Sequence, residues 1–250
     1  VLRKDHGNSA VNALLKLEWL QKIDEIVERD PLANLQVFDL NEIQLTSEQL
    51  QVSQSIKAEL NNNNPNRRPM LLHGVTGSGK TEIYLQLMQK TLDKKQQVLF
   101  LVPEIGLTPQ LFEAISSRFG NCVGLIHSST SEKSRAEAWL SARENKLSII
   151  LGTRSSIFVP FHSLGLIVVD EEHDESYKQQ SGLMYSARDL AVVKAKKSGS
   201  GLVLGSATPS YESLLNAENG KYNEVQLNKK VFNTAPPEKR LINLNVNPSN

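Results

Sequence analysis

The sequence predicts an α/β protein with a parallel sheet covered by helices on both faces, and three observations support that fold class. Short apolar runs alternate along the chain with segments of helical periodicity, which is the pattern of a parallel sheet with crossover helices. The apolar runs are continuous rather than interrupted by polar residues, as expected of strands that are buried on both sides. The length of 250 residues suits one sizeable domain with a small appendage.

The predicted strands and helices follow one another from residue 70 to residue 217. Each strand is a short, mostly aliphatic run, and each helix is a longer segment whose apolar residues recur every three or four positions. The strands are expected at Met70–His73, Val98–Val102, Cys122–Ile126, Ser148–Leu151, Leu166–Asp170 and Leu202–Leu204. The helices are expected at Thr81–Leu92, Pro109–Phe119, Ser131–Asn145, Ala187–Lys197 and Tyr211–Ala217.

The segments that flank this region have a different character. Asn8–Leu20 is expected to be a helix and Lys22–Arg29 a strand, so we interpret residues 1–44 as the tail of a preceding module. The Asn- and Pro-rich stretch 61–69 is expected to be a loop. The polar residues 231–250 are typical of a linker. The start without Met suggests a fragment of a longer protein.

Composition and charge exclude several classes of protein. The 28 Lys and Arg residues balance 27 Asp and Glu residues, a net charge of +1, which excludes a strongly basic protein or an acidic tail but not a local basic groove. No apolar run approaches 18 residues, so we expect no membrane partner, and the first residues lack the apolar core of a signal peptide. The single cysteine, Cys122, excludes an internal disulfide framework and a cysteine-only metal site and suits a reducing compartment.

A phosphate-binding loop follows the first predicted strand. The segment Gly74–Thr81 (GVTGSGKT) matches the pattern GxxxxGK[ST] between a strand and a helix. Its glycines let backbone amides turn toward phosphate oxygens, and the helix N-terminus adds a positive dipole. Lys80 can reach the β- and γ-phosphates, and Thr81 can ligate Mg²⁺. The residues expected to bind the nucleotide are Gly74, Val75, Thr76, Gly77, Ser78, Gly79, Lys80 and Thr81.

A second chemical signal lies at the end of an apolar strand, where Asp170, Glu171, Glu172 and His173 follow one another. Ligands bind at the carboxyl end of a parallel sheet. An aspartate there can hold Mg²⁺, and an adjacent glutamate can deprotonate the attacking water. Alone, this stretch would be interpreted as a solvated acidic loop. With the phosphate loop it predicts a nucleoside triphosphatase in which Lys80, Asp170 and Glu171 are catalytic and Asp170 and Thr81 bind the metal.

The order of the motifs resembles a known family. Asp-Glu-x-His after a phosphate loop is similar to the superfamily 2 helicases and translocases, and over residues 45–219 the chain resembles the replication-restart helicases (the primosomal protein N′ family). The resemblance implies the first of two RecA-like motor lobes, spanning residues 45–230, with ATP and Mg²⁺ as cofactors. The strings that carry it are GVTGSGKTE, LVPEIGLTPQ, GTRSSIF, VVDEEHDESYKQQ, YSARDLA and LGSATPS.

The resemblance also assigns roles to single residues. Residues 170–173 correspond to motif II and residues 206–208 to motif III. Gln49 is similar to the glutamine that reads adenine in such motors, and an amide does offer both a donor and an acceptor. Taken alone, Gln49 would be interpreted as an exposed helix residue. The residues implied to couple nucleotide to DNA are His173, Ser206 and Thr208.

Polar residues after two other predicted strands point toward DNA. Thr108 and Gln110 follow one strand, and Thr153 and Arg154 follow another, on the same side of the sheet as the nucleotide. Hydroxyls, helix amides and arginine are typical contacts to a phosphate backbone. The resemblance implies that these motifs track a single DNA strand. Without it they would be ordinary strand–helix turns.

An aromatic loop is implied to sense DNA. Tyr177 and Tyr185 flank the stretch KQQSGLM, and bases stack on aromatic side chains. The chain departs from the family pattern at Leu183, where many relatives have a tryptophan. A surface loop with two tyrosines is the alternative interpretation.

The resemblance implies a wider setting. It predicts a 3′→5′ DNA helicase that remodels stalled replication forks and starts primosome assembly, in the bacterial cytoplasm and associated with the nucleoid. Implied partners are single-stranded and forked DNA, the single-stranded-DNA-binding protein and other primosome proteins. Residues 1–44 would then be the end of a winged-helix-like module. Zinc is expected in full-length relatives, without a site in this chain.

Two alternatives stay open at this point. One is another superfamily 2 motor, such as a RecG-like translocase, which the string SYKQQ after DEEHDE disfavours. The other is a nucleic-acid-binding module with a vestigial phosphate loop, which the intact Lys80, Thr81, Asp170 and Glu171 disfavour. The resemblance further implies that the fragment hydrolyses ATP poorly, because the arginine finger belongs to the second lobe.

Overall fold

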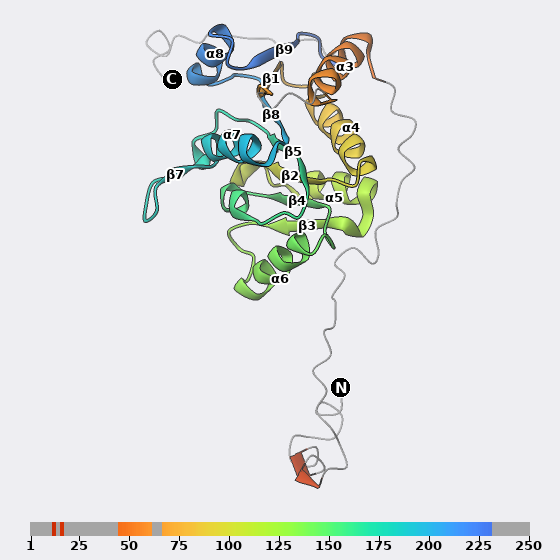
Figure 1. Cartoon of the computed structure of the whole chain (residues 1–250), viewed down its shortest axis with the longest axis vertical. Coiled ribbons are helices and arrows are strands. Elements are labelled where there is room, and N and C mark those ends of the chain that lie inside the picture. The colour runs from red at the N-terminus through yellow and green to blue at the C-terminus, as the bar shows by residue number, and fades with distance from the viewer. Residues whose placement is uncertain (1–11, 14–15, 18–44, 62–66, 232–250) are drawn as a thin grey trace, which may run out of the picture. The chain divides into compact units, whose positions relative to one another are not determined.

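The computed structural model describes residues 12–13, 16–17, 45–61 and 67–231 (Figure 1). The chain divides into two compact units, residues 1–34 and 35–250. In the first unit, residues 12, 13 and 16 are helical. Otherwise the helix and strand predicted within residues 1–44 lie outside the described residues, as do the linker after residue 231 and most of the predicted loop.

The second unit is built on a seven-stranded sheet in which every neighbouring pair of strands is parallel. Its strands are β1 (Met70–Gly74), β2 (Gln97–Leu101), β3 (Val123–Ile126), β4 (Ile149–Gly152), β5 (Leu164–Val169), β8 (Gly201–Ser206) and β9 (Asn223–Leu227). They are arranged in the order β3-β4-β2-β5-β8-β1-β9. The predicted parallel α/β arrangement is confirmed, and β9 is an additional edge strand that the apolar runs do not predict.

The helices include one that the apolar runs do not predict. They are α3 (Ser47–Asn61), α4 (Lys80–Asp93), α5 (Pro109–Phe119), α6 (Glu132–Arg143), α7 (Ala187–Ser198) and α8 (Tyr211–Glu218). The additional helix is α3. Short 3-10 turns are η1 (Glu104–Gly106), η2 (Gly120–Cys122), η3 (Arg154–Phe158) and η4 (Glu175–Tyr177), and β6 (Lys178–Gln179) pairs antiparallel with β7 (Tyr185–Ser186). Helices α5 to α8 each begin with a side-chain cap, in which the N-cap hydroxyl accepts a hydrogen bond from the backbone amide three residues later. The four N-cap residues are Thr108, Ser131, Ser186 and Ser210.

The core consists of two apolar clusters, one on each face of the sheet. Successive strand residues point to opposite faces, so Leu71 belongs to one cluster and Leu72 to the other. Helices α3, α4 and α5 contribute to the Leu72 cluster, and α6 and α7 to the Leu71 cluster. This two-sided burial explains why the strands read as continuous apolar runs.

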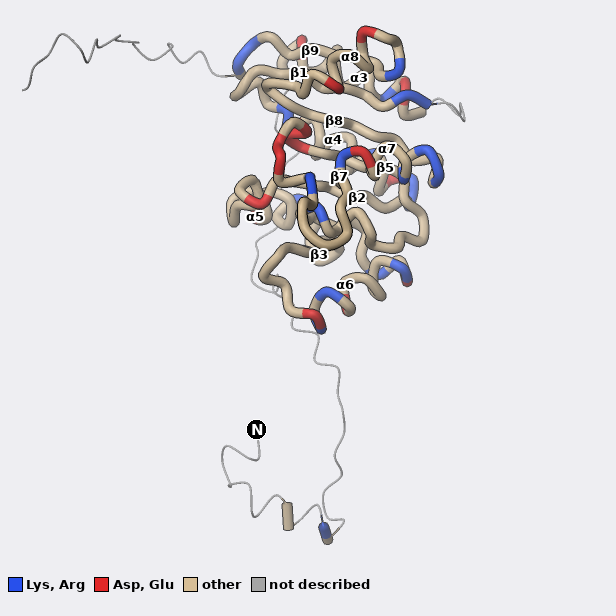
Figure 2. Tube along the Cα trace, turned by 90° about the vertical axis from the view of Figure 1, so that its left-hand side faces the viewer, with Lys and Arg blue, Asp and Glu red and all other residues tan. Residues whose placement is uncertain are grey.

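The topology brings the predicted motifs to one edge of the sheet. The phosphate loop follows β1, Asp170 follows β5, and Ser206 ends β8, which lies between those two strands. In Figure 2, lysines and arginines are interspersed with aspartates and glutamates over this unit, in keeping with the near-zero net charge. Among the described helices, none is long and apolar enough to cross a membrane.

Candidate active site

The phosphate loop connects β1 to α4 and leaves the start of that helix open. Gly77 and Gly79 have φ angles of 80° and 82°, in the left-handed region that glycine adopts without steric penalty. Gly79 is the N-cap of α4, and no described side chain caps the first turn. The first amides of a helix have no intrahelical partner, so this terminus is suited to an anion.

The environments of two side chains in the loop indicate that it binds a phosphate ligand. The Lys80 ammonium is buried and donates to the Gly74 carbonyl at 2.9 Å. The Ser78 hydroxyl is buried without a hydrogen-bond partner among the described residues, although buried polar atoms are normally paired. An unpartnered hydroxyl beside an uncapped helix N-terminus fits a bound triphosphate.

Gln49 supports the loop from α3. Its amide nitrogen donates to the Ser78 carbonyl at 2.9 Å, and its amide oxygen accepts from the Thr46 amide at 2.9 Å. The side chain is 4% exposed, so the alternative of an exposed helix residue is wrong. Each amide atom has one further hydrogen-bonding position, and adenine recognition by Gln49 stays a prediction.

The segment after β9 also returns to the phosphate loop. The carboxylate of Glu48 accepts from the amides of Asn228 and Lys229 at 2.9 and 3.1 Å. The Val231 amide then donates to the Gly77 carbonyl at 2.9 Å. The described start of the predicted linker therefore contacts the nucleotide site, which no local sequence pattern indicated.

Asp170 follows β5 and is held by two tyrosines. Tyr84 donates to its carboxylate oxygen Oδ1 at 2.9 Å, and Tyr177 donates to its main-chain oxygen at 2.6 Å. Burial and, second, the neighbouring Glu171 carboxylate raise the pKa of Asp170, whereas the Tyr84 hydrogen bond lowers it. Burial and then Asp170 raise the pKa of Tyr84 well above its usual value, so the tyrosine is the proton donor of this pair.

The described residues hold no group of three or more His, Cys, Asp or Glu that could bind a metal ion by itself. Magnesium is usually held by one or two protein ligands together with phosphate oxygens. Asp170 and Thr81, with a triphosphate on the loop, fit that pattern.

Glu171 faces the phosphate loop and is open to solvent. Its Oε1 lies 3.7 Å from Lys80 Nζ and its Oε2 3.6 Å from His173 Nδ1, with 38% of the side chain exposed. Its backbone has a φ of 44°, a left-handed conformation that costs a non-glycine residue about 1 kcal/mol or more. The structure thus brings the predicted catalytic residues Lys80, Asp170 and Glu171 together.

Glu172, the next residue, has a structural role that the sequence did not indicate. Its side chain is 1% exposed. It accepts from the Ser210 amide at 2.6 Å, from the hydroxyls of Ser210 and Ser213 at 2.9 and 2.8 Å, and from Arg188 at 3.3 Å. A carboxylate with four protein donors is not available to a water molecule, so Glu172 is not a second candidate base.

His173 connects motif II to motif III. Its Nδ1 lies 2.8 Å from Ser206 Oγ, and its Nε2 lies 3.4 Å from Thr208 Oγ1. Ser206 Oγ also accepts from the Thr208 amide at 2.9 Å. The three residues predicted to couple nucleotide and DNA therefore form one hydrogen-bonded cluster.

Two of the predicted DNA contacts need correction. Thr153 is 3% exposed, because it is the N-cap of η3 immediately after the buried strand β4. Tyr177 is 1% exposed, because its ring packs in the core beneath Asp170. A buried hydroxyl cannot reach a phosphate and a buried ring cannot stack on a base, so neither side chain is accessible to DNA in this conformation.

The other predicted DNA residues lie at or near the surface. Thr108 and Gln110 are exposed at the start of α5. Arg154 is partly buried and donates to the Ser176 carbonyl at 3.1 Å, which ties η3 to η4. Tyr185 is partly exposed and packs edge-on against Phe158, with ring centroids 4.9 Å apart. Their contacts with DNA stay predictions.

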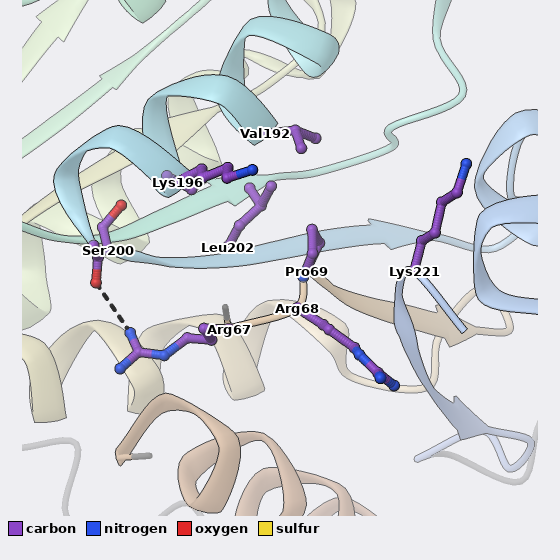
Figure 3. Close-up of a pocket in the computed structure, with 10 residues that line it drawn as sticks. Arg67, Arg68, Pro69, Val192, Lys196, Ser200, Leu202 and Lys221 are labelled. Atoms are coloured by element: carbon purple, nitrogen blue, oxygen red, sulfur yellow. Dashed lines mark hydrogen bonds between the residues drawn. The ribbon is translucent and has the colours of Figure 1, made fainter. Parts of the chain in front are cut away.

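A separate cavity of about 300 Å³ lies at the opposite edge of the sheet (Figure 3). It adjoins the beginnings of β1, β8 and β9 rather than their ends, so it is not part of the nucleotide site. Its labelled lining combines basic and apolar side chains: Arg67, Arg68, Lys196, Lys221, Pro69, Val192 and Leu202.

A family model and the related proteins both identify this chain as similar to helicases. The family model of the DEAD/DEAH box helicases matches residues 46–217. The chain is similar to the replication restart protein PriA of Bacillus subtilis, with 37% identity over 242 residues, or 97% of this chain and 30% of that protein. It is also similar to PriA of Haemophilus influenzae, with 50% identity over 164 residues, or 66% of this chain and 22% of that protein. The chain thus spans less than a third of either relative.

Solved structures share the fold at lower identity. A structure of RecG bound to a three-way DNA junction matches 79% of this chain and 25% of that chain, with a TM-score of 0.54 and 23% identity. The UvsW helicase from bacteriophage T4 matches 91% of this chain and 86% of that chain, with a TM-score of 0.52 and 15% identity. At these identities the likeness supports the α/β lobe alone.

Proposed function

The chain belongs to the DEAD/DEAH box helicase family, and from this premise we propose that it is the ATP-binding motor lobe of a 3′→5′ DNA helicase that remodels stalled replication forks and starts primosome assembly. The resemblance to the replication-restart helicases and the RecA-like lobe are confirmed. The activity and partners of a whole helicase are part of the proposal, because the chain spans less than a third of those relatives.

The observation that carries the proposal is the approach of Lys80 to Glu171 across the space between the phosphate loop and β5. With a nucleotide on the loop, Lys80 would exchange the Gly74 carbonyl and Glu171 for phosphate oxygens, since it is the one cation in the sequence of the loop. Glu171, then released from Lys80, is placed to accept a proton from the attacking water. Asp170 and Thr81 would hold Mg²⁺, which neutralises phosphate charge when it is bound.

The coupling of hydrolysis to DNA would run through the His173, Ser206 and Thr208 cluster. Thr108, Gln110 and Arg154 are proposed to contact backbone phosphates of a single strand, so binding would depend on salt and not on sequence. Single-stranded and forked DNA, the single-stranded-DNA-binding protein and other primosome proteins are the proposed partners. The proposed setting is the bacterial cytoplasm at the nucleoid, with zinc confined to other parts of a full-length protein.

The alternatives are less well supported. A RecG-like translocase rests on a structural likeness at 23% identity, which supports the fold alone, whereas the PriA relatives reach 50% identity. A vestigial phosphate loop is disfavoured by the close grouping of Lys80, Asp170 and Glu171.

Titration of this chain with a fluorescent ATP analogue tests the proposal. We expect saturable binding in Mg²⁺ that is weaker in EDTA, weaker by about ten-fold or more in Lys80→Ala and kept in Lys90→Ala, which changes an exposed lysine on the same helix. Absence of binding by the parent chain would refute the nucleotide site.

Phosphate release with single-stranded DNA tests the single-lobe part of the proposal. The chain should hydrolyse ATP very slowly, because an arginine finger from a second lobe contributes about 10³–10⁵-fold in related triphosphatases. Turnover of about 1 s⁻¹ or faster, ordinary for a complete enzyme, would contradict that part.

A further inference from the structure

Tyr84 links the phosphate-loop helix to the metal-binding carboxylate. It lies on α4 one turn after Lys80, and residues four apart share one face of a helix. Its side chain is completely buried, and its hydroxyl donates to Asp170 Oδ1 at 2.9 Å. The same face of α4 therefore carries the predicted phosphate ligand and a hydrogen-bond donor to the aspartate of motif II.

The space for this contact is provided by Gly205 in β8. A Cβ at Gly205 would overlap the hydroxyl oxygen of Tyr84 and would lie 2.8 Å from its ring carbon Cζ. Strand β8 runs between β1 and β5, so any larger residue at this position would obstruct the path from α4 to Asp170. The side chain of Tyr84 also packs edge-on against Phe100, with ring centroids 5.6 Å apart, which orients the ring.

The opposite side of Asp170 is fixed by Tyr177. This buried residue of η4 donates its hydroxyl to the main-chain oxygen of Asp170 at 2.6 Å. Asp170 is thus held at its backbone by one tyrosine and at its carboxylate by another. A carboxylate has two oxygens, and a donor that holds Oδ1 determines where Oδ2 points.

We propose that Tyr84 is a positioning residue that holds Oδ1 of Asp170 so that Oδ2 faces the metal ion of the bound nucleotide, and that Gly205 is required for this contact. The inference rests on the proposed function, because it assumes a magnesium nucleotide on the phosphate loop. The contact joins α4 to the end of β5, and so it also fixes the spacing between the two halves of the nucleotide site.

The test compares the affinity for a fluorescent ATP analogue in Mg²⁺ and in EDTA. Tyr84→Phe keeps the ring and removes the donor. Because hydrogen bonds to charged groups are stronger than those between neutral groups, we expect the affinity for the analogue in Mg²⁺ to fall by about five- to ten-fold. In EDTA, Tyr84→Phe and the parent should bind the analogue equally, since Asp170 then has no metal to bind. Tyr211→Phe, an exposed tyrosine on α8, is the matched control and should match the parent in both buffers.

A second variant and a second measurement keep the inference refutable. Gly205→Ala should lose at least as much affinity in Mg²⁺, because its methyl group displaces the hydroxyl. A double-mutant cycle of urea unfolding with Tyr84→Phe and Asp170→Ala, which removes the acceptor, measures the contact without nucleotide and should show non-additive effects.

Three results would overturn the inference: equal Mg²⁺ affinity in Tyr84→Phe and the parent, equal losses in Mg²⁺ and EDTA, or additive unfolding effects in the cycle. Failure of the proposed function has a different signature. It appears as absent nucleotide binding in the parent chain or as equal binding in Lys80→Ala.

Discussion

Replacing Glu172 by glutamine should destabilise the lobe, whereas the same change at its neighbour Glu171 should not. Glutamine keeps the shape of the side chain but removes the charge and turns one acceptor oxygen into a donor. At Glu172, Oε1 accepts from the Ser210 amide, and Oε2 accepts from two hydroxyls and from Arg188. Either orientation of the new amide therefore places a donor against a donor.

The size of the effect follows from burial. The Glu172 side chain is fully buried and Arg188 nearly so, and removing one partner of a buried ion pair costs about 3–5 kcal/mol. Because the amide keeps part of the hydrogen bonding, we expect a loss near the lower limit, about 3 kcal/mol. For a domain of this size that lowers Tm by about 6–12 °C. Glu171 is partly exposed, and Glu171→Gln should change stability by less than about 0.5 kcal/mol.

Urea unfolding followed by far-UV circular dichroism measures both variants against the parent. A loss below about 1 kcal/mol in Glu172→Gln, or an equal loss in Glu171→Gln, would refute the assignment of a structural role to Glu172 alone. The comparison separates the two glutamates because Glu171 is partly exposed, whereas Glu172 is buried among four donors.

Other predictions follow from individual side chains. Lys80→Ala should lower the affinity for a triphosphate analogue by about ten-fold or more, measured by equilibrium titration, and an unchanged affinity would contradict its role. Gln49→Ala should weaken ATP and GTP analogues alike, because it loses the bond to the Ser78 carbonyl; an additional loss for ATP would measure an adenine contact. Burial lowers the pKa of Lys194 from 10.5 to about 8, so between these values the unfolded state holds more protons and stability rises with pH. Over this pH range the free energy of unfolding in urea should rise by about 1–2 kcal/mol more in the parent than in Lys194→Met. Lys197→Met, which changes an exposed lysine, is the control and should rise as the parent does. A fall in the free energy of unfolding of the parent over this range would contradict the sign.

The strands that carry the site could be predicted because they are buried on both faces. Helix α3 and strand β9 could not, because their burial is one-sided and partly polar. In α3 the buried residues include Gln49 and Ser53 beside Val52 and Ile56, so its apolar periodicity is weak. In β9 only Leu227 is buried, which leaves no apolar run to recognise.

The phosphate loop and motif II could be predicted because local sequence determines them. The contacts that hold them could not, since they join residues far apart in the chain, as from Tyr84 to Asp170 or from Glu172 to Ser213. The misassigned Tyr177 shows the same limit. The sequence around an aromatic residue in a polar loop does not show whether its ring is exposed to a base or buried in the core.

The four consecutive residues of motif II contact four different parts of the lobe. Asp170 binds Tyr84 of α4, Glu171 faces Lys80, Glu172 is anchored to α7 and α8, and His173 contacts Ser206. Such divergence within four residues requires a sharp backbone turn, which the left-handed conformation of Glu171 provides. A nucleotide that displaced Glu171 from Lys80 would therefore act on the same short turn whose His173 contacts Ser206 at the end of β8. The buried Glu172 between them anchors that turn to α7 and α8, so the turn would move only with those helices or by losing these hydrogen bonds.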